Sequence, residues 1–259
     1  MQNTLEEMLN FAHNLAWQAG KITLRYFQTN LLTEVKSDNS PVTVADRETE
    51  RFIREAISKR YPDHAVLGEE DGRTGDSQAP WRWIIDPLDG TRSFVRGFPL
   101  YGVMIGVEYE GEPMIGVVNM PALNEVVYAA KDLGCWWNGR RCWVSEKKTI
   151  ADGLFVATRA NNYERYGGGK QAAFDRLLAQ AGMFRTWGDC YGYLLVATGR
   201  AEVMLDPEMR IWDAAALLPI LHEAGGTFTD WHGIPTIDGG EGLGTNGHVR
   251  DEVLKLLSL

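Results

Sequence analysis

The most informative part of the chain runs Trp83-Ile84-Ile85-Asp86-Pro87-Leu88-Asp89-Gly90-Thr91-Arg92-Ser93-Phe94. The apolar residues 83–85 predict a buried strand that ends at Asp86. Asp89 follows three residues later in a tight turn, so the two carboxylates can reach the same small volume. Pro87 fixes φ in this turn, and Gly90 lets the backbone approach a ligand closely. Because hard divalent cations prefer several oxygen ligands, the spacing favours a metal site. A turn stabilised by Asp side chains, with no ligand, is the alternative.

The residues after this turn favour phosphate binding. Gly90 and Thr91 are expected to begin a short helical turn that reaches Phe94, and backbone N–H groups at such a start can contact a phosphate. Two further acids lie at the ends of predicted elements, because Glu69 follows an apolar run and Asp213 begins a helix-like run. A single acid in such a place is usually a turn former or a helix cap. The argument for a site therefore depends on the whole set.

The rest of the chain alternates between helical and extended patterns. The spacing of apolar residues predicts helices over 4–28, 44–61, 170–181, 190–198, 213–224 and 248–257. Short apolar runs predict strands at 65–67, 83–85, 154–157 and 201–205, and three antiparallel strands within 101–128. A polar turn is expected at 36–41, and Gly225-Gly226 should end the helix that begins at Asp213. The pattern predicts a layered α+β fold in one domain, with halves 1–148 and 149–259 sharing a cleft.

Composition narrows the class of protein. The chain has 259 residues, of which 44% are hydrophobic, so a sizeable core can form. No apolar stretch is long enough for a transmembrane helix, and no secretory signal is seen, so we expect a cytoplasmic protein without a membrane partner. Three cysteines without paired spacing fit a reducing compartment. The net charge of -9 argues against nucleic acid as a partner, while a local metal site would still permit a small anionic substrate.

Five segments together resemble a known family. These segments are Val42-Thr43-Val44-Ala45-Asp46, Gly68-Glu69-Glu70, the Trp83–Phe94 run quoted above, Trp212-Asp213-Ala214-Ala215-Ala216 and Glu223-Ala224-Gly225-Gly226. In this order and spacing the chain is similar to the inositol monophosphatase-like, lithium-sensitive phosphatases over nearly its whole length. The resemblance implies a five-layered αβαβα sandwich, and a homodimer.

The resemblance also implies the roles of individual residues. The expected metal ligands are the side chains of Glu69, Asp86, Asp89 and Asp213 and the backbone carbonyl of Leu88. The implied cofactor is Mg²⁺, with two or three ions in each active site, Mn²⁺ as an alternative and Li⁺ as an inhibitor.

Catalysis is expected to use water rather than a covalent intermediate. The resemblance assigns Asp46 and Thr91, together with Glu69, to orienting and activating this water, and the amides of Gly90 and Thr91 to the phosphate. A phosphate monoester dianion repels a nucleophile, and metal ions reduce this repulsion, so positioning and electrostatics would supply most of the rate.

The substrate is predicted from the second half of the chain. Residues 185–193 and 197–207 are similar to the histidinol-phosphate phosphatases of the superfamily, which hydrolyse L-histidinol phosphate in histidine biosynthesis. Asp189 and Asp206 would complement the ammonium and imidazole groups of this substrate. Arg185 would contact the phosphate or pair with Asp189, and Asp213 is a further expected substrate contact. Alternatively, Asp189 caps the 190–198 helix and Arg185 is a solvated charge.

Other functions stay open at this point. Inositol monophosphate, fructose bisphosphate or a 3′-phosphoadenosine nucleotide could be the substrate. A regulatory or RNA-associated protein that keeps the fold is an alternative of another class, but the complete carboxylate set and the negative net charge argue against it. We therefore expect a small phosphorylated metabolite as the substrate.

Overall fold

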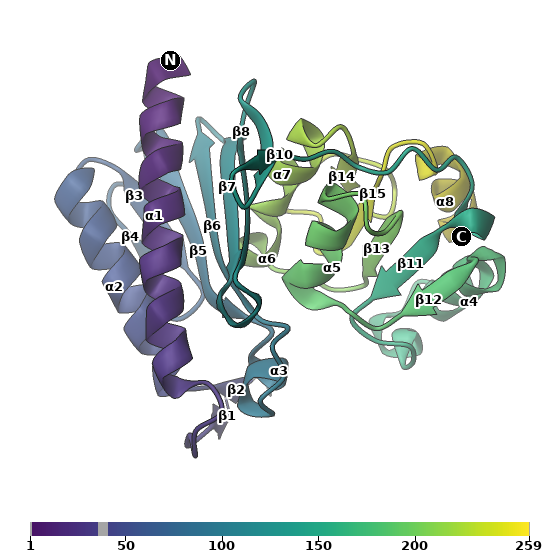
Figure 1. Cartoon of the computed structure of the whole chain (residues 1–259), viewed down its shortest axis with the longest axis horizontal. Helices are drawn as coiled ribbons and strands as arrows, with labels where there is room; N and C mark the ends of the chain where they lie inside the picture. Colours follow the sequence, from purple (N-terminus) through teal and green to yellow (C-terminus); the bar gives the residue numbers. More distant parts are fainter. Residues whose placement is uncertain (1, 36–40, 259) are drawn as a thin grey trace.

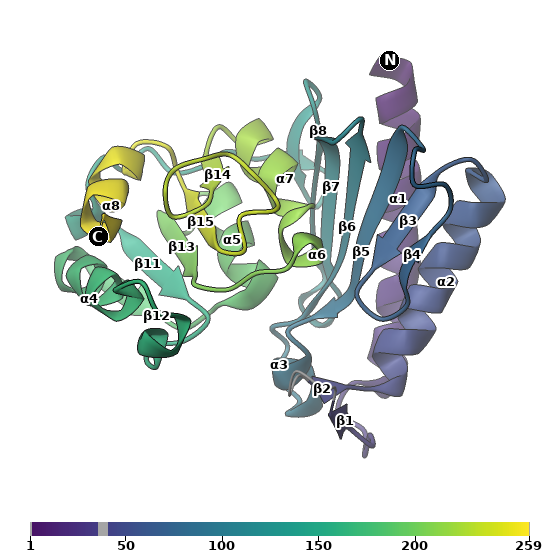
Figure 2. The same ribbon diagram turned by 180° about the vertical axis from the view of Figure 1, so that it is seen from behind.

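The computed structural model describes residues 2–35 and 41–258, and its elements form five layers (Figures 1 and 2). The helices are α1 Gln2–Tyr26, α2 Val44–Arg60, α3 Thr91–Val95, α4 Lys170–Gln180, α5 Asp189–Ala197, α6 Ile211–Ala214, α7 Leu217–Glu223 and α8 Arg250–Leu257. The strands are β1 Glu34–Val35, β2 Pro41–Val42, β3 Ala65–Gly68, β4 Gly72–Thr74, β5 Trp81–Asp89, β6 Gly102–Tyr109, β7 Glu112–Met120, β8 Glu125–Ala130, β9 Gly134–Trp137, β10 Arg140–Arg141, β11 Leu154–Ala157, β12 Met183–Arg185, β13 Val203–Asp206, β14 Thr227–Thr229 and β15 Gly242–Thr245. Short 3₁₀ turns cover Pro121–Leu123, Ile150–Asp152 and Tyr163–Tyr166.

The first two layers are the helix pair α1 and α2 and a large sheet. The sheet has eight strands in the order β10-β9-β8-β7-β6-β5-β3-β4, and only β3 and β5 pair in parallel. The apolar stripe of α1 is buried against this sheet, as its 3.6-residue spacing predicts. One face of the sheet is thereby closed, so the other face is available for the central helices.

The remaining three layers are central helices, a second sheet and outer helices. Helices α5, α6 and α7 lie between the sheets, and their apolar side chains share one core with both. The second sheet has five strands in the order β12-β11-β13-β15-β14, and α4 and α8 cover its outer face. This arrangement confirms the αβαβα sandwich expected from the resemblance.

Two facing glycines let the central layer sit directly on the first sheet. Gly106 of β6 and Gly116 of β7 are paired in register. A Cβ atom on Gly116 would lie 2.0 Å from the backbone oxygen of Ala216, and one on Gly106 would lie 2.6 Å from Cβ of Ala215. The chain between α6 and α7 therefore rests on bare strand backbone, which fixes the height of α6 above the sheet.

Most predicted elements are confirmed, but two predictions differ: the helix over 213–224 is divided, and the tight turn expected between Asp86 and Asp89 is a bulged part of β5, which continues to Asp89. The structure contains the long N-terminal helix, the 44–61 helix, the three antiparallel strands and the helices near 170–181, 190–198 and 248–257. The expected single helix over 213–224 is instead divided into α6 and α7, and neither includes Ala215 or Ala216, although both residues keep helical backbone angles. Residues 36–40 of the predicted polar turn lie outside the described residues. In the two described ranges, no helix is both long and apolar enough to cross a bilayer.

Candidate active site

An irregularity in β5 brings two carboxylates to one edge of the first sheet. Asp86 pairs with Met104 of β6, whereas Asp89 pairs with Gly102, so β5 has one more residue than β6 between these pairs. Such a bulge bends a strand and redirects its side chains. The backbone N–H of Leu88 donates to Oδ1 of Asp86 at 2.9 Å, which holds the turn.

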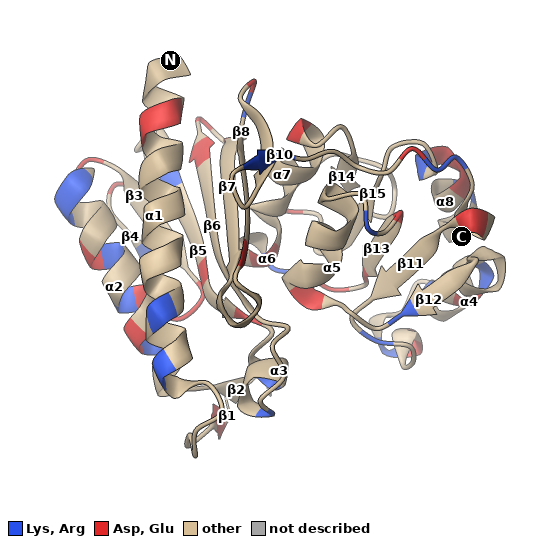
Figure 3. Cartoon of the chain, viewed as in Figure 1, with Lys and Arg blue, Asp and Glu red and all other residues tan. Residues whose placement is uncertain are grey.

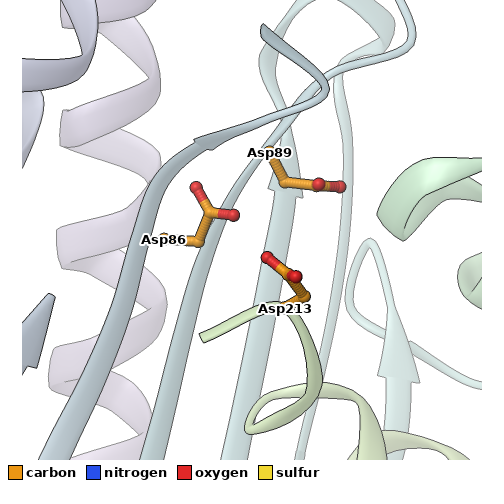
Figure 4. Close-up of side chains that lie close together, drawn as sticks. All are labelled: Asp86, Asp89 and Asp213. Carbon is orange, nitrogen blue, oxygen red and sulfur yellow. The ribbon is translucent and has the colours of Figure 1, made fainter. Parts of the chain in front are cut away.

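Asp213 joins these two residues from the central layer. Carboxylate oxygens of Asp86, Asp89 and Asp213 all lie within 4.8 Å of one another, and Figure 4 shows the three side chains gathered around one small volume. The backbone N–H of Arg210 donates to Asp213 at 2.7 Å, and that of Cys190 donates to Asp89 at 2.5 Å. Figure 3 shows acidic segments of β5, α5 and α6 in the region between the two sheets.

The electrostatics of these three carboxylates, Asp86, Asp89 and Asp213, here called the acidic triad, favour a bound cation. Burial raises the pKa of Asp86 well above its ordinary value, and the charges of Glu69, Asp89 and Asp213 raise it further. The pKa of Asp213 is raised for the same reasons, with Asp89 as the strongest neighbour. Like charges held together in a buried place destabilise each other unless a positive charge neutralises them. Several carboxylate oxygens converging in this way are the donor set that Mg²⁺ prefers.

Two of the predicted metal ligands, Glu69 and the carbonyl group of Leu88, lie outside the acidic triad. Glu69 follows β3, and its backbone N–H donates to the carbonyl of Ile85 at 3.2 Å. The charge of Glu69 raises the pKa values of Asp86 and Asp213, so Glu69 lies near the triad. It is not among the three residues whose carboxylate oxygens lie within 4.8 Å of one another. The carbonyl oxygen of Leu88 accepts a hydrogen bond from the Thr91 hydroxyl at 3.0 Å.

The predicted pair of Asp46 and Thr91 comes together at the side of the triad. The Thr91 hydroxyl lies 3.3 Å from Oδ1 of Asp46. The other oxygen of Asp46 accepts from the backbone N–H and the hydroxyl of Thr43, at 2.8 and 2.6 Å, in a capping box that begins α2. Burial raises the pKa of Asp46 despite these bonds. The helix cap thus fixes a carboxylate that is able to take up a proton.

Gly90 occupies a place that no other residue fits. Its φ of 81° is left-handed, and a Cβ atom would lie 2.8 Å from the carbonyl oxygen of Leu100. Gly90 and Thr91 line an open cavity of about 330 Å³ together with Arg92, Thr158 and Arg159. We call it the phosphate-side cavity. It lies next to the triad because Gly90 directly follows Asp89 in the chain.

A second cavity adjoins the first, and the two share Thr158, Arg159 and Asp189 in their linings. It has a volume of about 170 Å³ and is lined by Asp89, Asp213, Asp189 and Asp206, among others. Burial raises the pKa of Asp206 to about 7, and it raises that of Asp189 well above its ordinary value, with further contributions from neighbouring carboxylates. We call it the acidic cavity.

Asp189 belongs to both cavities and does not cap its helix. It has the positive φ of 51°, which is uncommon outside glycine, and its backbone N–H donates to the Thr158 hydroxyl at 2.9 Å. The start of α5 has no hydrogen bond from a capping side chain. The alternative interpretation of Asp189 as a cap is therefore wrong.

The structure corrects the prediction for Arg185. This side chain is exposed, donates to the carbonyl oxygen of Phe184 at 2.7 Å and lines neither cavity. The register explains its position, because Arg185 is level with Val156 of β11 and stops short of the sheet edge. Arg159, which lies two residues beyond the end of β11, lines both cavities instead.

No motif in the sequence pointed to Arg159. Its guanidinium lies 5.6 Å from the ring centroid of Tyr166 and lowers the pKa values of Asp189 and Asp206 through its charge. Across residues 2–35 and 41–258 no carboxylate lies within ion-pair distance of this guanidinium. Arg159 is thus a cation in the shared wall of the two cavities.

The fold and the acidic triad define a phosphomonoesterase of a known class. The chain belongs to the inositol monophosphatase family, whose pattern matches residues 4–256.

Individual relatives narrow the comparison. A histidinol-phosphatase of Chlorobaculum parvum is 45% identical over 238 residues, which cover 91% of this chain and 90% of the relative. A histidinol-phosphatase of Streptomyces coelicolor is 35% identical and covers 96% of both chains. The crystal structure of the extragenic suppressor protein SuhB from Bartonella henselae superposes with a TM-score of 0.90, at 28% identity, over 97% of this chain and 98% of that one.

Proposed function

We propose that this phosphomonoesterase hydrolyses L-histidinol phosphate to L-histidinol and phosphate, with Mg²⁺ as its cofactor. The observation that carries the proposal is the acidic cavity, which joins the triad to Asp189 and Asp206. The identity with curated histidinol-phosphatases supports the same substrate.

The acidic cavity suits a cationic leaving group. Histidinol carries an ammonium group and an imidazole, and carboxylates complement both through charge and hydrogen bonding. The hydroxyl groups of Thr158 and Tyr193 lower the pKa of Asp206 against the effect of burial, so they favour its charged form. Inositol offers only hydroxyl groups, and buried carboxylates facing it would lack a positive partner. This difference favours histidinol phosphate over inositol phosphate.

The chain's own residues would hold the cofactor and the phosphate. Asp86, Asp89 and Asp213 would bind Mg²⁺, with Glu69 and the carbonyl of Leu88 beside them. When bound, such ions neutralise phosphate oxygens and make a coordinated water more acidic. The phosphate would lie in the phosphate-side cavity, where Arg159 supplies a positive charge opposite the Gly90 turn.

Asp46 and Thr91 would prepare the attacking water. The Thr91 hydroxyl can donate its one proton toward Asp46 or Leu88, which leaves its lone pairs free to accept from water. As water attacks phosphorus, its proton would pass to Thr91 while the Thr91 proton moves to Asp46. The raised pKa of Asp46 makes it a better proton acceptor than an exposed aspartate.

A substrate panel tests this proposal. We would measure phosphate release from L-histidinol phosphate, inositol 1-phosphate, fructose 1,6-bisphosphate and 3′-phosphoadenosine 5′-phosphate, with Mg²⁺ and then with a chelator. The expected result is a kcat/KM for histidinol phosphate at least about 100-fold above the others, because two charge-assisted contacts are lost with leaving groups that carry no positive charge. Activity should disappear with the chelator.

Each other outcome has a definite meaning. Equal rates on histidinol and inositol phosphates would refute the substrate and leave the phosphatase chemistry intact. Activity that survives the chelator would refute the role of the acidic triad. An Asp46→Asn variant with unchanged kcat would exclude the proton path through Thr91.

A further inference from the structure

Two of the three cysteines face each other at the edge of the first sheet. The Sγ atoms of Cys135 and Cys142 are 3.4 Å apart, and both cysteines are free. Cys190 lies elsewhere, with its Sγ atom 3.5 Å from Sδ of Met120. Nothing in the phosphatase site accounts for the paired thiols.

The backbone already holds this pair in a disulfide-compatible register. Trp136 of β9 pairs with Arg141 of β10, and the N–H of Cys142 donates to the carbonyl oxygen of Cys135 at 3.1 Å, which extends the ladder by one pair. Directly opposed residues of antiparallel strands have Cα atoms about 4.5–5.5 Å apart, within the range of disulfides. The strands join at Asn138 and Gly139, which have positive φ angles of 47° and 78° and form a tight turn. A bond between the sulfurs therefore needs side-chain rotation and no unfolding.

The two thiols differ in their exposure to solvent and in the direction in which their pKa values are shifted. Cys142 is 7% exposed, whereas Cys135 is fully buried. A hydrogen bond with the Cys135 thiol lowers the pKa of Cys142, and the positive charges of Arg141 and Arg200 lower it further. The same contact, together with burial, raises the pKa of Cys135. Cys142 is therefore the thiol that ionises and meets a small oxidant first.

We propose that Cys135 and Cys142 are a redox modification site, which a hydroperoxide converts into a reversible intrachain disulfide. The Cys142 thiolate attacks one oxygen of the peroxide, the O–O bond breaks, and Cys142 becomes a sulfenic acid. The Cys135 sulfur then attacks the Cys142 sulfur, the S–O bond breaks, and the oxygen leaves as water with the Cys135 proton. Two thiols thus supply two electrons, and one hydrogen peroxide becomes two water molecules. A dithiol reductant returns both thiols by exchange.

The disulfide would close a small ring around the Asn138–Gly139 turn. Cys142 also begins the segment that crosses to the second sheet, where the N–H of Val144 donates to the carbonyl oxygen of Ala224 at 3.0 Å. Oxidation therefore links β9, which contains Cys135, covalently to the start of this crossing. Amide hydrogen exchange across residues 134–144 should become slower in the oxidised protein.

Peptide mapping of the full chain tests the proposal. The reduced protein is treated with hydrogen peroxide, unfolded in the presence of an alkylating reagent and digested without reductant. We expect a cross-link between Cys135 and Cys142, while Cys190 stays alkylated, and we expect dithiothreitol to restore both thiols. A matched Cys190→Ser variant should form the same cross-link.

Single variants separate the roles of the two thiols. Cys142→Ser should react with peroxide at least about tenfold more slowly, because the low-pKa thiol is lost. Cys135→Ser should stop at a sulfenic acid on Cys142 that dimedone traps. Three alkylated cysteines after oxidation of the wild-type protein, or a cross-link through Cys190, would overturn the proposal. This result depends on no variant folding and is independent of the substrate.

Discussion

Asp86 is buried beside other carboxylates, and its burial and their charges raise its pKa. An Asp86→Asn variant should therefore increase the free energy of unfolding of the metal-free protein, by about 1–2 kcal/mol, because one repelling charge is removed. The same variant should lose at least about 100-fold in kcat/KM, because a metal ligand contributes several kcal/mol to charge stabilisation.

Thermal unfolding with and without Mg²⁺ measures both effects. The wild-type melting temperature should rise with Mg²⁺, whereas that of Asp86→Asn should change little. An equal Mg²⁺-dependent shift in the two proteins would mean that the ion binds elsewhere.

Arg159 and Arg185 form a matched pair for mutation. Arg159 lines both cavities, whereas Arg185 is exposed and bonds to the backbone of Phe184. Arg159→Gln should raise KM for the phosphate ester about tenfold or more, since a charge-assisted hydrogen bond contributes about 1.5–3 kcal/mol. Arg185→Gln should leave steady-state kinetics nearly unchanged. Similar kinetics for both variants would remove Arg159 from the binding site.

The residues that meet around the acidic triad were predictable because their positions depend on local sequence. Asp86, Asp89 and Gly90 lie in one hexapeptide, and Asp46 completes the capping box of a helix whose apolar pattern is clear. Arg159 was missed because its position depends on the pairing of β11 with β12 and β13. Register of this kind comes from tertiary packing, and a single sequence offers no sign of it.

Among the elements, the junction of α6 and α7 depends most on close packing. A Gly116→Ala substitution would place a methyl group 2.0 Å from the backbone oxygen of Ala216. The junction must then move away from the sheet, and we expect a loss of about 2 kcal/mol or more in stability. Asp213 would move with α6, so the effect of Mg²⁺ on stability should also weaken.

The exposed start of the same strand supplies the control. Glu112→Ala removes a surface ion pair with Lys131 and should change stability by less than about 1 kcal/mol. Chemical denaturation with and without Mg²⁺ compares the two variants. An unchanged Mg²⁺ response in Gly116→Ala would show that the junction does not position Asp213.

This junction also explains the wrong helix prediction. The run from Asp213 to Ala224 is rich in Ala and Leu, so its intrinsic propensity favours one helix. The structure divides this run at Ala215 and Ala216, where the backbone lies directly against Gly106 and Gly116 of the sheet. Several short strands, among them β14 and β15, were missed because their runs are brief and rich in glycine and threonine.

For the whole molecule, the buried acids predict a pH-dependent stability. Burial raises the pKa of Asp206 to about 7 from 3.8, so the folded state binds its proton more tightly than the unfolded state. The stabilisation is complete below about pH 4 and is lost as the pH rises to about 7. In metal-free protein, raising the pH from 5 to 7 should cost about 2 kcal/mol from this group.

An Asp206→Asn variant isolates this contribution. Its metal-free stability should fall less steeply between pH 5 and 7 than that of the wild-type protein, whose other buried acids remain. Urea unfolding at several pH values with a chelator present provides the slopes. Parallel slopes would mean that Asp206 is ionised in the folded protein across this range.

The ligands of the acidic triad are far apart in the chain, because Asp86 and Asp89 end β5 whereas Asp213 lies in α6. During synthesis the first sheet leaves the ribosome before α6 exists, so its acidic edge has to wait for the rest of the chain. Domains usually fold from the N-terminus as they emerge. A nascent chain that stops before residue 213 therefore lacks one carboxylate of the proposed cation site. On this proposal, activity first becomes possible when synthesis has passed residue 213.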